Sequence, residues 1–303
     1  MDTPSPKTPS GRKPAWLKVA IPHGQKWRGM SELIARRGLH TVCDEAACPN
    51  KAECWGCGTA TFMVLGDVCT RGCRFCAVAT GKQGSPVNAA EPEELARAVA
   101  ELGLRYAVIT SVDRDDLTDR GAGHFASCIR AIRAANPSAL VEVLIPDFRG
   151  AELDELLAAG PDVVAHNVET IRRLQNVRDA RAGFDLSLRT LREAKEKAGV
   201  PTKSSLLLGI GEREEEVYQA MDELRSAGCD ILVMGQYLQP TRFQIPVEEY
   251  VTPDTFARYA DMARSKGFSS VVSSPLARTS YHAREGHAAL SGVAPENRAG
   301  ERE

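Results

Sequence analysis

The stretch T-F-M-V-L-G-D-V-C-T-R-G-C-R-F-C, from Thr61 to Cys76, joins an apolar run to three cysteines spaced C-x₃-C-x₂-C. The run Phe62–Val68 predicts a strand, and the cysteines follow at its carboxyl end. In α/β barrels, functional groups gather at the carboxyl ends of the strands. This stretch therefore predicts the first strand of the fold and, beside it, a cysteine-based site.

The chain beyond this stretch alternates short β-branched runs with amphipathic helical patterns. The expected strands are Tyr106–Thr110, Val141–Ile145, Val163–Val168, Ser204–Ile210, Ile231–Gln236 and Ser270–Ser273. The expected helices are Glu91–Leu102, Gly123–Ala135, Ala151–Ala159, Phe184–Ala198, Glu214–Ala227 and Pro253–Lys266. Such alternation is typical of a parallel sheet covered by helices. Because no G-x-G-x-x-G motif follows the first strand, we predict an α/β fold, a partial (β/α)6-type TIM-like barrel, rather than a dinucleotide-binding sheet.

Four segments are expected along the chain. Residues 1–14 are rich in Pro, Ser and Thr and predict a disordered arm, and residues 15–60 form an N-terminal extension. Residues 61–275 form the barrel, and residues 276–303 form a C-terminal tail. The extension has too little apolar material for a core of its own, so we expect one compact unit.

The composition is that of an ordinary globular protein. Of the 303 residues, 43% are hydrophobic and 26% are charged, and the formal net charge is −2. This charge gives no support for a nucleic-acid or membrane-surface partner, and no apolar stretch approaches the ~20 residues that span a bilayer. The N-terminus lacks a secretory pattern. We therefore expect a cytoplasmic protein, and a monomer.

Six of the nine cysteines form two triplets: Cys43, Cys48 and Cys54, then Cys69, Cys73 and Cys76. A chain of this length does not need disulfides as staples, so metal binding is the better interpretation. Zinc is the alternative, but zinc ribbons usually present paired knuckles, and His23 and His40 lie at no zinc spacing. Thiolates are the usual ligands of a 4Fe–4S cluster, and three of them leave one iron open. The triplets thus predict two 4Fe–4S clusters.

The second triplet carries an aromatic residue, Phe75, directly before its last cysteine. With this spacing, the motif resembles that of the radical S-adenosylmethionine superfamily. An open iron can chelate the amino and carboxylate groups of S-adenosylmethionine. Electron transfer into the sulfonium then cleaves a carbon–sulfur bond and gives a 5′-deoxyadenosyl radical that abstracts unactivated hydrogens.

The first triplet, C-x₄-C-x₅-C, allows two interpretations. One is a cluster or metal that only fixes the extension, with Cys57 as a fourth thiolate. The other is a second reactive cluster, because a purely structural cluster more often has four cysteines. The spacing alone leaves both open.

From Leu39 to Gly81 the sequence resembles the lipoyl synthase family, which carries both triplets in this order. Further matching stretches are Ile109–Leu117, Val141–Gly150, His166–Thr170, Gly228–Pro240, Tyr250–Pro253 and Arg278–Ala283. The resemblance implies a radical sulfurtransferase that inserts two sulfurs, at C6 and C8, into an octanoyl chain amide-linked to a lysine of a carrier domain. It also implies that the first cluster is sacrificed as the sulfur source.

The resemblance implies the other site residues as well. In the family, a serine of a C-terminal R-S-S-Y motif is the fourth ligand of the first cluster. This chain reads R-T-S-Y, so we assign Ser280, with Thr279 as the fallback. A hard alkoxide should be a weak and displaceable ligand of a cluster iron. The expected contacts of S-adenosylmethionine are Ser111, Asn167, Glu169 and Arg178.

The implied partners are octanoylated lipoyl-carrier domains, of a 2-oxoacid dehydrogenase E2 or of the glycine cleavage H protein. A reduced ferredoxin or flavodoxin-type donor would supply electrons, and an iron–sulfur cluster carrier would rebuild the first cluster. Two alternatives stay open. One is another two-cluster radical enzyme, such as a methylthiotransferase or a peptide-maturing enzyme, and the other is an inert iron–sulfur protein.

The chain departs from the family pattern at several places. Arg120 and Cys57 stand where glycine is usual, Arg172–Asp185 lacks the usual proline and tyrosine, and Ser274 replaces the glycine before Pro275. None of these is an assigned cluster ligand. We interpret the departures in the barrel and tail as drift or altered carrier recognition, and Cys57 as a spectator.

Overall fold

The barrel is an open, mostly parallel sheet. A computed structural model describes residues 13–19, 25–46, 48, 50–56, 60–281, 283–288 and 290, so Cys57 and most of the expected arm at residues 1–14 lie outside the described residues. The main sheet has the order β1 (His40–Thr41), β2 (Thr61–Val64), β5 (Tyr106–Ser111), β6 (Leu140–Leu144), β7 (Val163–Ala165), β8 (Thr202–Leu208), β9 (Ile231–Gln236) and β10 (Ser270–Ser273). Neighbours from β2 to β10 are parallel, and β1 is antiparallel to β2. Across the described ranges no pairing joins β10 back to β1 or β2, which confirms the partial barrel.

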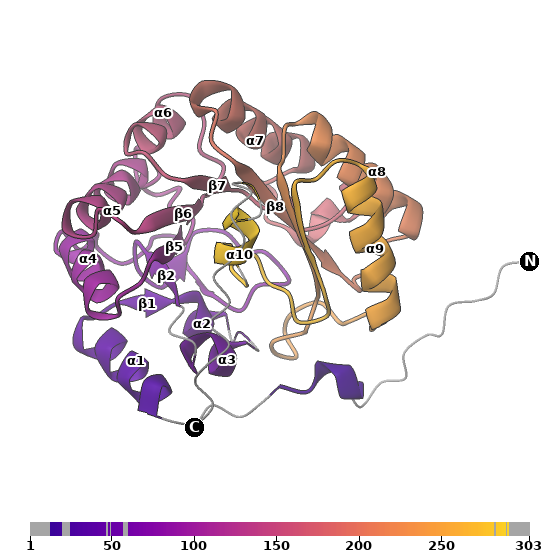
Figure 1. Ribbon diagram of the computed structural model, residues 1–303, viewed down its shortest axis with the longest axis horizontal. Helices are drawn as coiled ribbons and strands as arrows, with labels where there is room; N and C mark the ends of the chain where they lie inside the picture. Colours follow the sequence, from indigo (N-terminus) through magenta and orange to yellow (C-terminus); the bar gives the residue numbers. More distant parts are fainter. Residues whose placement is uncertain are drawn as a thin grey trace, which may run out of the picture.

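Helices cover the outside of this sheet (Figure 1). They are α4 (Glu91–Glu101), α5 (Ala122–Ala135), α6 (Ala151–Ala158), α7 (Phe184–Ala198), α8 (Glu214–Ser226) and α9 (Pro253–Ser265). Each follows one of the main-sheet strands β2, β5, β6, β7, β8 and β9. The six helices predicted from the sequence are confirmed to within one residue at each end. Pro92 and Pro253 lie in first turns, where a missing N–H leaves no helical bond unmade.

The prediction of a single strand over residues 62–68 is wrong. β2 ends at Val64, because Leu65 and Gly66 adopt left-handed φ angles of 70° and 89° and turn the chain out of the sheet. A separate ribbon follows, in which β3 (Val68–Cys69) pairs with β4 (Ala79–Thr80) on the far side of the second triplet. The second triplet therefore lies in a loop that is closed at both ends.

The inside of the barrel contains a buried ion pair. Lys203 on β8 and Glu142 on β6 are at most 2% exposed and lie 2.8 Å apart, and Tyr106 on β5 donates to the other Glu142 oxygen at 2.6 Å. Breaking such a pair leaves an uncompensated buried charge, at a cost of about 3–5 kcal/mol. The pair therefore fixes three strands relative to one another beneath the site.

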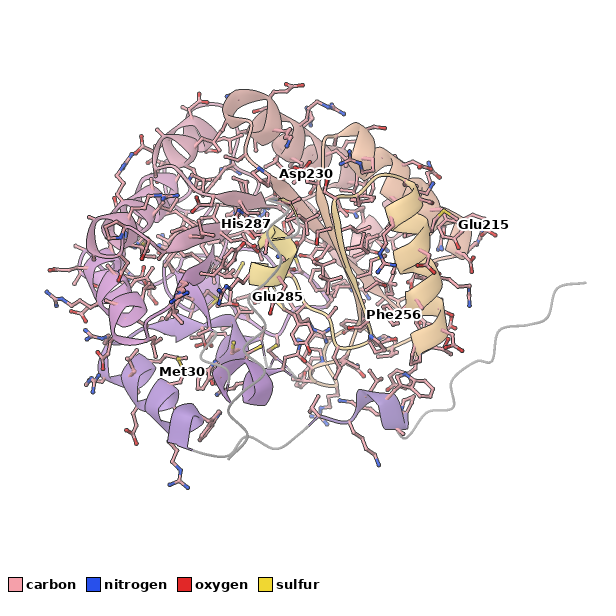
Figure 2. All side chains as sticks on the ribbon, viewed as in Figure 1. Met30, Glu215, Asp230, Phe256, Glu285 and His287 are labelled. Carbon is pink, nitrogen blue, oxygen red and sulfur yellow. The ribbon has the colours of Figure 1, made fainter. Side chains whose placement is uncertain are left out.

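The N-terminal extension and the C-terminal tail both pack on the barrel. The extension consists of η1 (Ala15–Leu17), α1 (Gln25–Arg36), α2 (Val42–Glu45) and α3 (Lys51–Gly56), together with β1. The described part of the tail contains α10 (Ala283–Ala288), in the middle of the helix ring in Figure 1. The ring of His287, labelled in Figure 2, lies 5.9 Å from that of Tyr106, at the start of β5. α10 thus lies at the amino ends of the strands, opposite the second triplet. No described helix is long and apolar enough to cross a membrane.

Candidate functional site

One cavity of about 560 Å³ lies inside the open barrel. It is lined by Cys69, Cys73 and Cys76 of the second triplet and by Cys43 and Cys48 of the first. The other expected site residues that line it are Ser111, Asn167, Glu169, Arg178, Thr279 and Ser280. Cys54 is the exception, since it lies in α3, half-buried against the hydrophobic core. Cysteines from both triplets and the distant tail thus face the same space.

The loop of the second triplet is positioned by barrel loops. Backbone hydrogen bonds tie it to the segment after β5 and to the segment before α7. Two further N–H groups point at sulfur: Arg71 N lies 3.4 Å from Cys69 Sγ, and Asp179 N lies 3.3 Å from Cys73 Sγ. Hydrogen bonds to the charged form of a group favour that form. These two donors therefore prepare the loop to hold thiolates.

Burial opposes thiolate formation in the chain without metal. It raises the pKa of Cys69 to about 11 and that of Cys73 to about 12. Burial also raises the pKa of Cys76, Cys43 and Cys48. Iron must therefore displace protons from these cysteines when it binds.

The first two cysteines of the first triplet lie around α2. Thr41 caps this helix, because its Oγ1 accepts a hydrogen bond from Asp44 N at 3.2 Å. Cys43 lies in the helix, and Cys48 N donates to Cys43 O at 3.2 Å. The backbone N–H of Thr61, at the start of β2, hydrogen-bonds to the Cys43 sulfur. This bond fixes the first triplet to the barrel.

Thr61 also contacts the C-terminal tail. Its Oγ1 donates to Ser280 Oγ at 2.7 Å, across 219 residues of sequence. A second link is made by Asn50, whose Nδ2 donates to Leu276 O at 2.6 Å. Thr61 therefore joins Cys43, through its backbone, to Ser280, through its side chain.

Thr279, the fallback ligand, has a different environment. Its Oγ1 donates to Ser205 Oγ at 3.1 Å and accepts from Asn167 Nδ2 at 3.0 Å. Its hydroxyl is therefore engaged with residues of the barrel, whereas the Ser280 hydroxyl meets Thr61. The geometry favours Ser280 as the residue that faces the first triplet.

The expected S-adenosylmethionine contacts include unpaired polar atoms. Ser111 Oγ and Asn167 Oδ1 are buried, and neither has a hydrogen-bond partner among the described residues. Glu169 adopts a left-handed φ of 63°, and burial raises its pKa. Arg178 lies at the same cavity wall and donates to Ser187 Oγ at 3.0 Å. Because buried polar atoms are normally paired, this wall fits a polar ligand.

An ionic network that the sequence did not predict lies behind the second triplet. Arg71 is 5% exposed, pairs with Asp147 and contacts Asp115 at 2.9 Å. His166 Nε2 lies 3.2 Å from an Asp147 oxygen. Burial opposes ionisation of Asp147, but His166 and Arg71 together hold its pKa below the usual value. Arg71 occupies a variable position of C-x₃-C-x₂-C, so the motif gave no signal for it.

The triplets do not form ready zinc sites. In the part of the chain that the structure describes, three ligand atoms within 4.8 Å of one another occur only at Glu91, His124 and Cys128. There Glu91 accepts from Leu65 N at 2.9 Å and lies 2.6 Å from His124 Nε2, so the group joins α4 and α5 to the turn after β2. The ligands of a cubane lie further apart than those of one zinc ion. None of the six triplet cysteines belongs to such a close group in the described part of the chain.

Comparisons with known proteins by family model and by sequence agree on one family. The family model of the Radical SAM superfamily matches residues 63–224. Lipoyl synthase of Methylococcus capsulatus is 55% identical over 278 residues, which are 90% of this chain and 85% of that protein. Lipoyl synthase of Thermus thermophilus is 50% identical over 282 residues, 92% of this chain and 87% of that protein. A chloroplastic lipoyl synthase of Arabidopsis thaliana is 49% identical over 288 residues, 92% and 73% of the two chains.

Solved structures with a similar fold are more distant in sequence. Methylornithine synthase superposes with a TM-score of 0.57 at 13% identity, over 68% of this chain and 62% of that one. The FeFe-hydrogenase maturase HydG from Carboxydothermus hydrogenoformans gives 0.58 at 15% identity, over 80% and 61% of the two chains. The match spans less than two thirds of each of these structures. At these identities the likeness concerns the fold alone.

Proposed function

The chain belongs to the lipoyl synthase family of the radical SAM superfamily, and we propose from this premise that it inserts sulfur at C6 and C8 of an octanoyl chain on a carrier-domain lysine. The observation that carries the proposal is one cavity lined by cysteines of both triplets and by the R-T-S-Y tail. A sulfur-inserting radical enzyme needs its radical source and its sulfur source within reach of one substrate chain. A shared cavity meets that need.

We assign Cys69, Cys73 and Cys76 to a 4Fe–4S cluster that binds S-adenosylmethionine at its open iron. When bound, this cluster supplies the electron that cleaves S-adenosylmethionine into a radical able to remove hydrogen from the octanoyl chain. The residues that hold S-adenosylmethionine in this proposal are Ser111, Asn167, Glu169 and Arg178. The unpaired buried oxygens of Ser111 and Asn167 support this assignment.

We assign Cys43, Cys48, Cys54 and Ser280 to the first-triplet cluster, a 4Fe–4S cluster that is consumed as the sulfur substrate. The hydrogen bond from Thr61 orients the Ser280 hydroxyl beside the Cys43 segment. Cys54 does not line the cavity, so its assignment rests on the cysteine spacing and on the family resemblance. A hard oxygen ligand on a cluster iron is readily displaced, which would open the cluster for sulfide transfer.

The proposed carriers are octanoylated domains of a 2-oxoacid dehydrogenase E2 or of the glycine cleavage H protein. A reduced ferredoxin or flavodoxin-type donor and an iron–sulfur cluster carrier complete the proposed partners. A reducing, cytoplasmic compartment is the proposed location, because none of the eight described cysteines forms a disulfide.

One experiment tests the proposal. The protein is reconstituted anaerobically with iron and sulfide, and both clusters are confirmed by iron analysis and spectroscopy. Dithionite, S-adenosylmethionine and an octanoyl-lysine peptide are then added, and 5′-deoxyadenosine and the peptide mass are followed. We expect 5′-deoxyadenosine to form and the peptide to gain two sulfurs. A methylated product or an unmodified peptide from the fully loaded protein would reject the proposal.

The role of Ser280 has its own test. Ser280→Cys replaces the hard oxygen by a soft thiolate, which should hold the first-triplet cluster more firmly. We expect the variant to keep its full iron content, to cleave S-adenosylmethionine and to release iron to a chelator more slowly, while sulfur insertion is lost. An active Ser280→Cys enzyme would contradict the assignment.

A further inference from the structure

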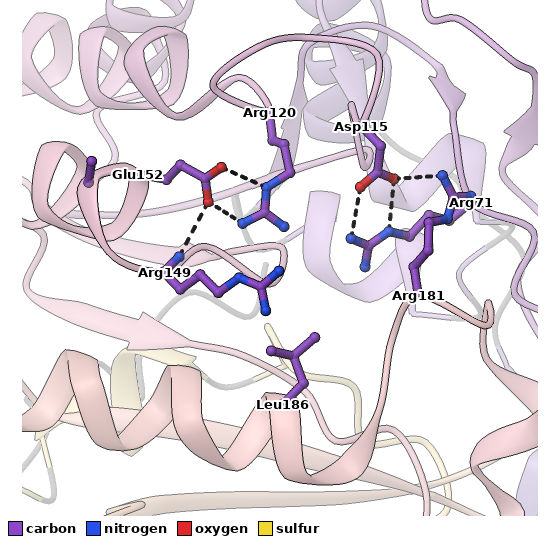
Figure 3. A pocket seen from close by; sticks show the side chains of 8 residues that line it. Arg71, Asp115, Arg120, Arg149, Glu152, Arg181 and Leu186 are labelled. Atoms are coloured by element: carbon purple, nitrogen blue, oxygen red, sulfur yellow. Dashed lines mark hydrogen bonds and ion pairs between the residues drawn. The ribbon is translucent and has the colours of Figure 1, made fainter.

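Figure 3 shows a second pocket, of about 540 Å³. It shares Arg71 with the cavity of about 560 Å³ that both triplets line, which is called the reaction cavity from here on. Four guanidiniums line it, from Arg71, Arg120, Arg149 and Arg181, against only two carboxylates, from Asp115 and Glu152. Arg71 belongs to the second-triplet loop, and the other arginines follow β5, β6 and β7. This arginine pocket therefore lies at the carboxyl ends of the strands, on the same side as the second triplet.

The two carboxylates leave one arginine unpaired. Asp115 is shared between Arg71 and Arg181, at 2.9 Å and 3.1 Å, Arg181 also pairs with Asp179 at 2.8 Å, and Glu152 pairs with Arg120. Arg149 is exposed, and no described residue provides a hydrogen-bond or ion-pair partner for its guanidinium. Figure 3 shows this group pointing into the pocket. The other three arginines are paired with carboxylates, so Arg149 is the one whose planar guanidinium is free for an incoming carboxylate.

The backbone of Arg120 gives a second, independent observation. Arg120 adopts a left-handed φ of 51°, a conformation that is unfavourable for a residue with a Cβ atom. Its side chain is held in place by a hydrogen bond to Asp147 O at 2.6 Å and by the Phe148 ring at 5.8 Å. Strained backbone of this kind clusters at functional sites. This strained position places a guanidinium on the wall of the arginine pocket.

The arginine pocket is connected to the reaction cavity through Arg71, which lines both. Arg71 pairs with Asp147 and lies 3.3 Å from Asp113, and both aspartates line the reaction cavity. A lysine whose acyl chain enters that cavity leaves its neighbouring residues at the rim. Consecutive residues of an extended chain are about 3.5 Å apart, so the side chains that flank the lysine come close to the arginines.

We propose that the arginine pocket binds carboxylate side chains next to the octanoylated lysine of the carrier domain, with Arg149 as the free donor. An acidic flank on the carrier then orients the lysine toward the reaction cavity. This inference rests on the proposed function, because it takes the octanoylated carrier as the partner. The pocket is a specificity-determining docking site and takes no part in the chemistry.

Two fluorescein-labelled peptides test this proposal by binding alone, without S-adenosylmethionine. One is Gly-Glu-(octanoyl-Lys)-Glu-Gly, and the other has Gln in place of both Glu residues. Fluorescence anisotropy gives the dissociation constants for the cluster-loaded protein and for the variants Arg149→Glu and Arg192→Glu. Arg192 is exposed on α7 and does not line the pocket, so its variant makes the same charge change elsewhere.

We expect the wild type to bind the Glu peptide about tenfold more tightly than the Gln peptide, the size of one partly exposed charge-assisted hydrogen bond. Arg149→Glu should abolish or invert this preference, whereas Arg192→Glu should keep it. The preference should also shrink at high salt, because exposed charges are screened. Equal affinity for the two peptides, an undetectable affinity for the Glu peptide, or equal effects of both variants would overturn the proposal. Failure of sulfur insertion, by contrast, would leave these binding constants unchanged and reject only the proposed function.

Discussion

The two cysteine triplets face one cavity but are held in place in different ways. The second triplet lies in one short loop, and its supporting N–H donors come from that loop and from the adjoining barrel segment. The first triplet lies in the N-terminal extension, and the tail is linked to that extension by Asn50, 226 positions away, and to the adjoining start of β2 by Thr61, 219 positions away. A site made of neighbouring segments forms with the barrel, whereas a site made of both chain ends needs both ends to dock. Their stabilities should therefore respond differently to changes in the tail.

This difference suits the roles proposed for the two clusters. The radical-generating cluster is reused in this proposal, and its loop is closed by the β3–β4 ribbon and tied to barrel loops by backbone hydrogen bonds. The sulfur-donating cluster must be emptied and rebuilt. Closure by a tail residue allows that site to open while the barrel and the other cluster stay in place.

The largest expected effect separates the triplets by cysteine replacement. Cys73→Ala should lower cleavage of S-adenosylmethionine by about 10³-fold or more, because the radical-generating cluster cannot be held without its ligand. Cys54→Ala should keep that cleavage and abolish sulfur insertion. Each variant should bind one cluster instead of two. 5′-Deoxyadenosine, peptide mass and iron content are the measurements.

Cys57→Ala is the matched control for Cys54→Ala, since it lies three residues further along and is the competing thiolate. We expect it to keep two clusters and full sulfur insertion. The reverse result, with Cys57 essential and Cys54 dispensable, would assign the third ligand of the first triplet to Cys57.

Much of the fold could be predicted from local sequence. The six helices that cover the barrel follow from periodicity, proline at first turns and glycine after last turns, which are signals carried within each segment. Leu65 is a counter-example, because nothing in its residue type predicts a φ of 70°. Its backbone N–H is held by Glu91 from the next helix, a tertiary contact that local sequence does not carry.

Only the site residues that belong to sequence motifs could be predicted. The cysteine spacings placed both triplets, and the family resemblance pointed to the tail serine. Thr61, which contacts both Cys43 and Ser280, was missed because it is an ordinary β-branched residue at the start of an apolar strand. The free guanidinium of Arg149 was missed for a related reason, because its meaning depends on three arginines from other loops.

A smaller effect, confined to the first triplet, is expected from Gly235→Ala. Gly235 lies on β9 where the tail crosses it, and an added Cβ would lie 2.0 Å from Ala277 O. Because the obstacle is backbone, the tail must move, and Ser280 moves with it. We expect sulfur insertion to fall by about 10- to 100-fold, as for a reacting group displaced by about 1 Å. Cleavage of S-adenosylmethionine should change little.

Gly183→Ala is the matched control, because its added Cβ meets nothing within 4 Å and its φ of −171° suits any residue. It should leave both activities near wild type. If Gly235→Ala lowered the two activities equally, the tail would be supporting the whole barrel, and the contrast between the triplets would be lost.

The smallest expected effect concerns a single hydrogen bond. Thr61→Val keeps the shape and burial of the side chain but removes the donor to Ser280 Oγ, while the backbone N–H that contacts Cys43 stays. A net loss of about 0.5–1.5 kcal/mol is typical for one such bond, so iron release from the first-triplet cluster to a chelator should speed up about 2- to 10-fold. Thr61→Ser keeps the donor and should restore the slow rate. If Thr61→Val instead released iron from both clusters at the same faster rate, the hydroxyl would be stabilising the barrel as a whole. If only the first-triplet cluster released iron faster in Thr61→Val, and Thr61→Ser restored the slow rate, Thr61 would be identified as the residue that positions Ser280.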